Sequence, residues 1–285
     1  MQVYVYAKSG HNFGLENVRR ASALCNVFKE TDPILCTADY RAATFAKSEL
    51  GVNRGVGVDV IGNLPHVMER GDILIYDDSG ESSETMQEHM EQFCTHLYKV
   101  GSHIPYDIVD STFTSDMETK YEKAIFFADD DYAEWFLKLC EQSSKQDLPM
   151  IMGHYFFLGN DDKLKPFFNQ IIDEEDYVEA IKTTKYLLTA SVHSCFESIA
   201  SGNFPVFFKR GDKDSIENIE LLDKYNIPIV TGETLDELIK NFDLTIKNYP
   251  KIKELEKFDF SAIKKDINDT IKKFEMIQPS LDYKF

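Results

Sequence analysis

The sequence lacks the patterns of a secreted, disulfide-stabilised or membrane-spanning protein. Its five cysteines are widely scattered and include no CxxC pair, which argues against a disulfide framework and a zinc site and indicates a reducing compartment. Neither a basic leader segment nor a long apolar run follows Met1. We therefore expect no signal peptide, no membrane span and a cytoplasmic location.

Basic residues are also scarce. The chain has 31 Lys and Arg against 49 Asp and Glu, a formal net charge of −18. This balance disfavours a protein that coats nucleic acid or an anionic membrane, because such binding depends on phosphate neutralisation by cations. It leaves room for a local basic groove. The 285 residues, 43% hydrophobic and 28% charged, indicate a folded protein with one large or two ordinary domains.

What the sequence does contain is a regular alternation of strand-like and helix-like segments. In the first half the strand-like runs are residues 2–7, 33–38, 55–62, 72–77 and 96–101. The helix-like segments between them are residues 15–30, 40–50, 64–70 and 81–95. Strands that alternate with helices predict parallel strands and right-handed crossovers, so this half is predicted to be a doubly wound unit.

A second cycle follows a connector at residues 102–123. Its strand-like runs are residues 123–128, 148–157, 185–191, 204–210 and 227–232. Its helix-like segments are residues 131–144, 161–172, 174–184, 195–202, 215–226 and a helical tail from 234. The chain is thus predicted to be an α/β protein with two Rossmann-like domains, residues 1–120 and 121–285, whose parallel sheets face each other across a cleft.

The segment LLTASVHSCFESIASGNFPVFFKR places a strand end next to a helix start. The strand ends at Ser191, and the helix is predicted to start near Ser194. Free N–H groups and the helix dipole at such a start suit a pyrophosphate. Glu197, one turn further in, could accept both hydroxyls of a ribose, as acidic residues do in dinucleotide folds. The alternative is an ordinary capped helix in which Ser194 and Glu197 form a capping box.

This segment resembles the donor-nucleotide site of GT-B glycosyltransferase-like enzymes. The superfamily's serine-rich turn, helix Glu, A-x-G and P-V recur here in the same order, at Ser191, Ser194, Glu197, Ala200, Gly202, Pro205 and Val206. The resemblance implies a GT-B fold in which Glu197 binds a uridine ribose, Ser194 and Cys195 contact phosphate, and His193 belongs to the same site. The stretch ESIASGNFPVFFK also resembles bacteriophage DNA glucosyltransferases, in the pattern E-x-x-A-x-G-x-x-P-V-F-x-K.

Over most of its length the chain resembles the UDP-sugar hydrolases of pseudaminic acid synthesis. The order of elements matches, and in the opening loop SGHNFGLENVRR, Gly14 falls on the family's first loop glycine and Arg20 on its helix arginine. The hydrolase's catalytic histidine, however, falls on Asn17, and its partner tyrosine falls on Ser79. Asparagine takes no proton from water near neutral pH, so hydrolysis by that family's mechanism is not expected.

Four other residues near this loop or at the end of the fourth strand could serve as general base. His11 lies in the same loop, and imidazole titrates near neutral pH. Glu16 stands at the helix start, where the dipole favours its charged form. Asp77 and Asp78 end the fourth strand, at the edge that faces the cleft. The alternatives are an exposed loop residue for His11, a first-turn acid for Glu16, and a turn with an N-cap for the two aspartates.

The second half offers further candidates around the donor. The run at residues 129–131 stands where GT-B relatives have a glycine-rich turn, and we interpret its three aspartates mainly as a helix cap. The end of the next strand could frame a nucleobase through Gly153, His154 and Phe156, with core packing as the alternative. Lys209 and Arg210 place positive charge near the proposed phosphate site. GT-B enzymes generally need no divalent metal, so no metal or other cofactor is expected.

Three hypotheses follow from these patterns. The first is a glycosyltransferase that moves a sugar from a nucleotide-sugar donor, UDP-type by resemblance, to a hydroxyl acceptor. That acceptor could be a surface glycan precursor, a small molecule or a modified base in phage DNA, although the acidic charge counts against DNA. The second is a nucleotide-sugar hydrolase with a displaced base such as His11, and the third is a non-catalytic nucleotide-sugar-binding relative. The sequence leaves the sugar, the acceptor and the oligomeric state open.

Overall fold

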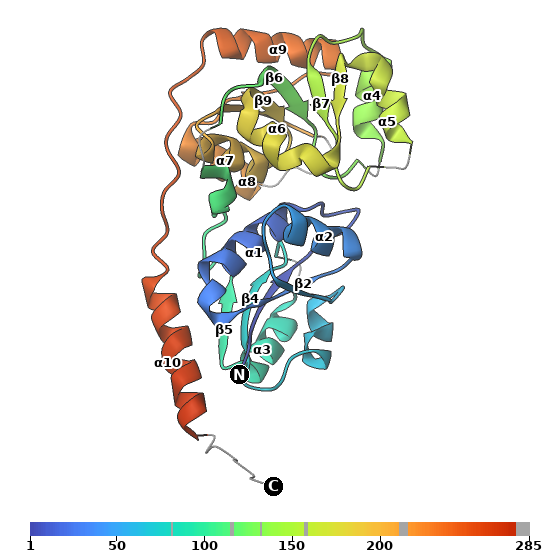
Figure 1. The fold of residues 1–285 in the computed structure, drawn as a ribbon. Coiled ribbons are helices and arrows are strands. Elements are labelled where there is room, and N and C mark those ends of the chain that lie inside the picture. Colours follow the sequence, from blue (N-terminus) through green and yellow to red (C-terminus); the bar gives the residue numbers. More distant parts are fainter. Residues whose placement is uncertain (81, 115–116, 132, 157–158, 211–215, 278–285) are drawn as a thin grey trace.

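The chain forms two α/β domains, each built on one parallel sheet (Figure 1). The computed structural model describes residues 1–80, 82–114, 117–131, 133–156, 159–210 and 216–277. The predicted elements extend beyond these described ranges at Glu81, Tyr132, Phe157 and Ser215 and, in the helical tail, at residues 278–285. We call the lobe with the first sheet the first domain and the other the second domain.

The first sheet has the order β3-β2-β1-β4-β5. Its strands are β1 (Val3–Ala7), β2 (Ile34–Thr37), β3 (Arg54–Gly57), β4 (Ile73–Asp77) and β5 (His96–Lys99). Its helices are α1 (Glu16–Val27), α2 (Tyr40–Ser48) and α3 (Glu84–Phe93). Every residue of the central strands β1 and β4 is buried, as expected for parallel strands covered by helices on both faces.

The second sheet has the order β11-β10-β9-β6-β7-β8. Its strands are β6 (Tyr121–Phe126), β7 (Pro149–Ile151), β8 (Gln170–Ile172), β9 (Thr184–Thr189), β10 (Phe204–Phe208) and β11 (Ile229–Val230). Its helices are α4 (Trp135–Glu141), α5 (Asn160–Leu164), α6 (Tyr177–Thr183), α7 (Val192–Ala200), α8 (Ile216–Tyr225) and α9 (Leu235–Lys247). The two doubly wound, all-parallel sheets confirm the predicted fold class.

Several predicted elements differ in extent from the structure. The helix predicted at 161–172 is confirmed only at its start, as α5. Pro166 stands in the middle of the predicted span, and the chain continues as strand β8, paired with β7. The helix predicted at 64–70 is replaced by a 3-10 helix at Ile61–His66. The helix predicted from 131 begins at Trp135, since the Asp131 carboxylate accepts the N–H groups of Trp135 and Phe136 at 2.8 and 3.1 Å.

The C-terminal tail returns to the first domain. Helix α10 (Ser261–Ile277) lies beside the first domain in Figure 1, far from α9. Ile263 and Ile267 are buried in the same hydrophobic cluster as strand β1, and His96 of β5 contacts Thr270 at 2.8 Å. The predicted boundary at residue 120 therefore separates the sheets, while the tail of the second segment packs on the first domain. None of the described helices is long and apolar enough to cross a membrane.

Candidate active site

The carboxyl ends of the two sheets meet at the loop that follows β1. Gly14 has a φ of +70°, and a Cβ added there would lie 3.0 Å from Asp129 Cβ of the second domain. The backbone N–H of Leu15 donates to Asp129 Oδ2 at 3.1 Å. A glycine is needed at position 14 both for its left-handed backbone and for this close approach.

A small cavity lies where this loop meets the second domain, and we call it the loop cavity. It has a volume of about 100 Å³. The first domain contributes Phe13, Gly14 and Glu16, and the second contributes Ala128, Asp129, Asp130, Ala190, Val192 and Arg210. It thus combines the first turn of α1, the first turn of α7 and a buried guanidinium.

Helix α7 starts two residues earlier than predicted. Its N-cap is Ser191, whose Oγ accepts the N–H of Ser194 at 3.1 Å. The N–H of Cys195 donates to the Ser191 carbonyl at 3.2 Å. The capping box of Ser194 and Glu197 is therefore wrong, and in this structure the N–H groups of Ser194 and Cys195 are taken. Val192, at the first position of the helix, lines the loop cavity instead.

Glu197 is fully buried and already paired. Its Oε1 lies 3.0 Å from Arg19 Nε, and its Oε2 accepts a short hydrogen bond from the Tyr177 hydroxyl. Burial raises the pKa of Glu197 to about 7, against the opposing effect of the Arg19 cation. In this structure Arg19 occupies the position beside the Glu197 carboxylate. A ribose can reach the carboxylate, as predicted, only after Arg19 has moved.

Asp129 is the second buried carboxylate that pairs with Arg19. Arg19 Nη1 donates to its Oδ2 at 2.7 Å, and His154 Nδ1 lies 3.3 Å from its Oδ1. Burial disfavours the charged form, but Arg19 and His154 outweigh burial and hold the pKa of Asp129 well below its ordinary value. Of the three aspartates interpreted as a helix cap, only Asp131 caps a helix, whereas Asp130 pairs with Arg210 at 3.4 Å.

A second, larger cavity between the domains has a volume of about 670 Å³, and we call it the interdomain cavity. From α2 it is lined by Tyr40, Arg41 and Phe45, and from the end of β7 by Gly153, His154 and Phe156. The structure thus brings the three residues predicted to frame a nucleobase together around one cavity. The His154 ring packs edge-to-face against the Phe45 ring, with the ring centroids 4.6 Å apart. Both domains therefore contribute to this wall of the cavity.

Solved structures with the same arrangement of domains hold nucleotides. HepE of Anabaena with UDP-glucose matches the chain with a TM-score of 0.53, at 11% identity over 96% of this chain and 100% of HepE. HepE with UDP and glucose gives a TM-score of 0.51, at 11% identity and the same coverage. The chain has the GT-B fold.

Other comparisons are weaker. The heptosyltransferase WaaC of E. coli with ADP matches with a TM-score of 0.43, at 10% identity over 87% of this chain and 98% of WaaC. No protein-family model matches the chain, and no curated protein matches it. At these identities the similarity establishes the GT-B fold, and the chemistry has to be argued from the residues in the cleft.

The four candidate bases are not equally placed in this GT-B cleft. Glu16 lines the loop cavity. His11 is exposed, with its ring 5.2 Å from the Tyr155 ring. Asp77 is buried and accepts from Arg20 Nε at 2.7 Å, and Asp78 accepts the N–H groups of Gly80 and Ser82, both at 2.9 Å.

The two positions that the resemblance aligned with a hydrolase's catalytic pair come together in the structure. Asn17 Nδ2 donates to Ser79 Oγ at 2.9 Å, and Asn17 Oδ1 accepts from Arg20 at 2.6 Å. The geometry places an amide and a hydroxyl where the resemblance implies a histidine and a tyrosine. Neither group can act as a general base near neutral pH.

The remaining predicted donor residues divide into buried and peripheral ones. Ser191, His193, Ser194 and Cys195 are all buried. Arg210 is buried at the end of β10, with its guanidinium 4.3 Å from the Phe127 ring centroid, whereas Lys209 is half-buried beside it. No group of three or more His, Cys, Asp and Glu in the part of the chain that the structure describes could hold a metal ion.

Four residues that join the domains were not singled out from the sequence. They are Arg19, Asp39, Tyr155 and Tyr177, and a representative contact is the hydrogen bond from the Tyr155 hydroxyl to Asp39 at 2.7 Å. The only signal for them was the arginine pair at residues 19 and 20, of which the family resemblance pointed to the second.

The buried position of His193 predicts how the free energy of unfolding depends on pH. Neither ring nitrogen has a hydrogen-bond partner among the described residues, although Nε2 lies 3.5 Å from Glu197 Oε1. Burial, with the nearby Arg20 and Arg19 cations, lowers the pKa of His193 well below 6.5. The folded chain keeps this ring neutral while the unfolded chain protonates it, so stability is lost as the pH falls below 6.5.

We expect His193→Leu to remove this acid sensitivity. Between pH 7.5 and 5.5 the wild-type free energy of unfolding should fall by about 1.4 kcal/mol relative to the variant, measured by urea denaturation. Glu197, whose raised pKa makes its own contribution fall as the pH rises from 4.5 to about 7, acts in the opposite direction, so a loss of stability toward acid pH identifies His193. Parallel pH profiles would show that His193 is not held neutral.

Proposed function

We propose that this chain is a glycosyltransferase that takes a sugar from a nucleotide-sugar donor, UDP-type, and transfers it to a hydroxyl acceptor. The observation that carries the proposal is the loop cavity. It gathers a carboxylate at Glu16, the start of α7 at Val192 and the cation of Arg210 in one place between the two domains. A helix start and a guanidinium suit the diphosphate, and a carboxylate opposite them suits an acceptor hydroxyl.

The interdomain cavity provides room for the rest of the donor. Its volume of about 670 Å³ is within the range of ordinary small-molecule sites. His154 lines this cavity and contacts Asp129, which lines the loop cavity. We place the nucleoside beside His154 and Phe156 and the diphosphate beside Val192 and Arg210. The HepE structures with UDP-glucose share this fold, which favours a uridine donor.

The transfer step uses Glu16 as general base. The acceptor oxygen forms a bond to the anomeric carbon, and its proton passes to the Glu16 carboxylate. The bond between the anomeric carbon and the phosphate oxygen breaks, and the electron pair leaves with the nucleoside diphosphate. Val192 N–H and the Arg210 guanidinium stabilise the charge that develops on that diphosphate.

The proposal predicts a distinct result for Glu16→Gln. This variant should bind the nucleotide-sugar with affinity within about twofold of wild type and lose about 10²-fold or more in turnover. His11→Ala is the matched comparison and should retain turnover, because His11 is exposed outside the loop cavity. Turnover is measured as nucleotide release from a panel of UDP-, GDP- and CMP-sugars with and without acceptors. Loss of activity in His11→Ala with activity kept in Glu16→Gln would transfer the role to His11.

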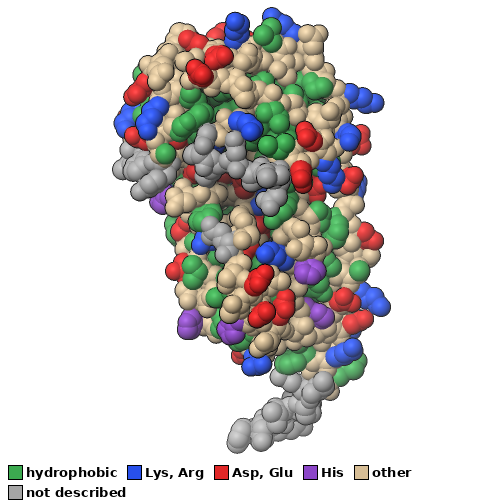
Figure 2. Space-filling view, turned by 180° about the vertical axis from the view of Figure 1, so that it is seen from behind, with side chains coloured by type: hydrophobic (Ala, Val, Ile, Leu, Met, Phe, Trp, Pro, Cys, Tyr) green, Lys and Arg blue, Asp and Glu red, His purple; other side chains and the backbone are tan. Residues whose placement is uncertain are grey.

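The same panel separates the alternatives. Nucleotide release without any acceptor would indicate a hydrolase, in which water takes the place of the acceptor hydroxyl. Saturable binding without release would indicate a non-catalytic relative. A DNA acceptor gains no support from charge, because Lys and Arg are dispersed among Asp and Glu over the face shown in Figure 2 and the net charge is −18.

A further inference from the structure

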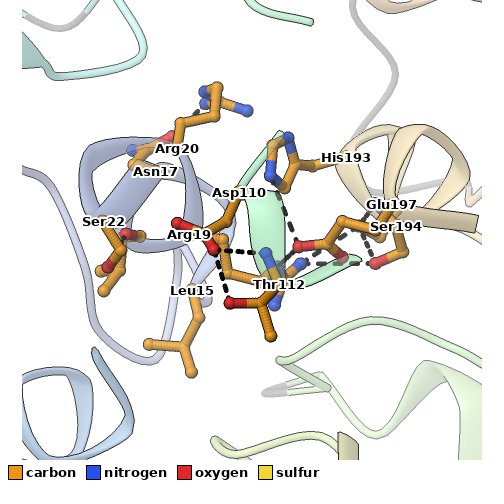
Figure 3. Close-up of polar contacts among 12 residues, drawn as sticks. Leu15, Asn17, Arg19, Arg20, Ser22, Asp110, Thr112, His193, Ser194 and Glu197 are labelled. Atoms are coloured by element: carbon orange, nitrogen blue, oxygen red, sulfur yellow. Dashed lines mark hydrogen bonds and ion pairs between the residues drawn. The ribbon is translucent and has the colours of Figure 1, made fainter. Parts of the chain in front are cut away.

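Arg19 extends out of the first domain and ends inside the second (Figure 3). Its guanidinium pairs with Asp129 at 2.7 Å and with Glu197 at 3.0 Å. It also donates to Ser194 Oγ at 3.3 Å and lies 4.7 Å from the Tyr177 ring centroid. The side chains of Arg19 and Glu197 are fully buried and that of Asp129 is 1% exposed. This cation is therefore the counter-charge for two carboxylates of the other domain.

The space left between the domains at this point is too small for the proposed donor. The loop cavity holds about 100 Å³, whereas pockets for small-molecule ligands of this size class have several hundred. A diphosphate with its sugar can enter only if the loop at Gly14 moves away from Val192. The loop continues directly into α1, which carries Arg19. Separating these two walls withdraws Arg19 from both carboxylates.

We propose that Arg19 is a latch that keeps the cleft closed without a donor and has to be withdrawn before a nucleotide-sugar enters. The identity of the ligand rests on the proposed function, while the latch itself rests on the contacts of Arg19. Other contacts across the cleft pair one charged group with one neutral group. The Tyr155 hydroxyl donates to Asp39 at 2.7 Å, and Arg41 donates to the His154 carbonyl at 2.9 Å. Arg19 alone among these pairs with two buried carboxyl groups.

The physical consequence is a shift in the equilibrium between closed and open cleft. Without the Arg19 cation, the closed state would keep Asp129 and Glu197 buried with only their contacts to Leu15, His154 and Tyr177 and no guanidinium, which is unfavourable. Opening lets water reach both carboxylates. A ligand that binds the open state has an apparent dissociation constant that is larger by the reciprocal of the open fraction. Removing the cation should therefore open the cleft and tighten nucleotide binding.

The test compares wild type with Arg19→Met and with Arg54→Met. Arg54 is the matched control, since it forms an exposed ion pair with Asp32 on the edge strand β3. Small-angle X-ray scattering without ligand gives the radius of gyration, and calorimetry gives the dissociation constant of UDP. We expect Arg19→Met to have a larger radius of gyration and to bind UDP at least tenfold more tightly, with Arg54→Met like wild type. An unchanged radius together with unchanged UDP affinity would overturn the latch.

The two measurements fail in different ways. An expanded Arg19→Met chain that binds no UDP supports the latch and overturns the nucleotide-sugar proposal. Equal radii and equal affinities keep the nucleotide proposal and overturn the latch. If Arg19→Met does not fold, the wild type decides through small-angle scattering with and without UDP. The latch requires a larger radius of gyration with UDP bound, because the donor enters only the open cleft. An unchanged radius with UDP bound would overturn the latch.

Discussion

Arg20→Met is expected to lower the free energy of unfolding of the first domain by about 3–5 kcal/mol. Arg20 lies one residue from the latch but acts within one domain. It donates to Asp77 at 2.7 Å and to Asn17 Oδ1 at 2.6 Å, and the Asp77 side chain is 1% exposed. The other oxygen of Asp77 has no hydrogen-bond partner among the described residues. The variant therefore leaves a buried carboxylate without its cation.

Two controls make the Arg20 result specific. Arg54→Met removes an exposed cation, whose side chain is 44% accessible, and should change stability little. The double variant Arg20→Met with Asp77→Asn should recover part of the loss, because it removes the uncompensated charge. Urea denaturation measures all three. A loss of similar size in Arg20→Met and in the double variant would show that lost packing, and not the lone charge, causes the effect.

Gly153→Ala is expected to destabilise the second domain by about 3 kcal/mol or more. A Cβ at this position would lie 2.2 Å from the Ala128 carbonyl oxygen and 2.7 Å from that of Asp129. Both are backbone atoms at the end of β6, so they cannot rotate away as a side chain would. The neighbouring His154 and the Asp129 backbone would have to shift, and both belong to the walls of the proposed donor site. Thermal or urea unfolding measures the loss.

The control for Gly153 is Gly57→Ala in the edge strand β3. An added Cβ at Gly57 meets no atom within 4 Å, and its φ is outside the left-handed region. This variant should therefore match wild type in stability. If Gly153→Ala also matches wild type in stability, the backbone at Gly153 does not lie as close to Ala128 and Asp129 as described. The pair separates a steric requirement for glycine from a general effect of alanine in a strand or turn.

The central strands of both sheets were predictable because their signal is local. Residues 73–76, for example, form a continuous apolar run between two aspartates, which is how a strand buried on both faces looks in sequence. Strand β8 was missed because it has three residues and follows a helix-like run interrupted by Pro166. The parallel direction of the strands followed from the alternation with helices, but the return of α10 to the first domain did not, since it depends on contacts between distant residues.

The sequence identified the chain segments that line the site, but not the contacts that individual residues make there. The turn at Ser191 and the strand end at Gly153 do face the first domain, as expected for carboxyl ends of parallel strands. The role of Glu197 could not be foreseen, because its partner Arg19 is 178 positions away and belongs to the other domain. Ion pairs between domains leave no periodic trace in a sequence. The arginine pair showed only that two cations follow the opening loop.

The most direct measurement of the central claim is nucleotide release from UDP-glucose and the rest of the sugar-nucleotide panel by wild type, with and without hydroxyl acceptors. The account predicts release that depends on an acceptor and that disappears in Glu16→Gln, whose UDP binding is retained. If neither wild type nor Arg19→Met binds or cleaves any sugar-nucleotide of the panel, the cleft between Gly14 and Val192 is not a donor site and the proposed glycosyltransferase activity is contradicted.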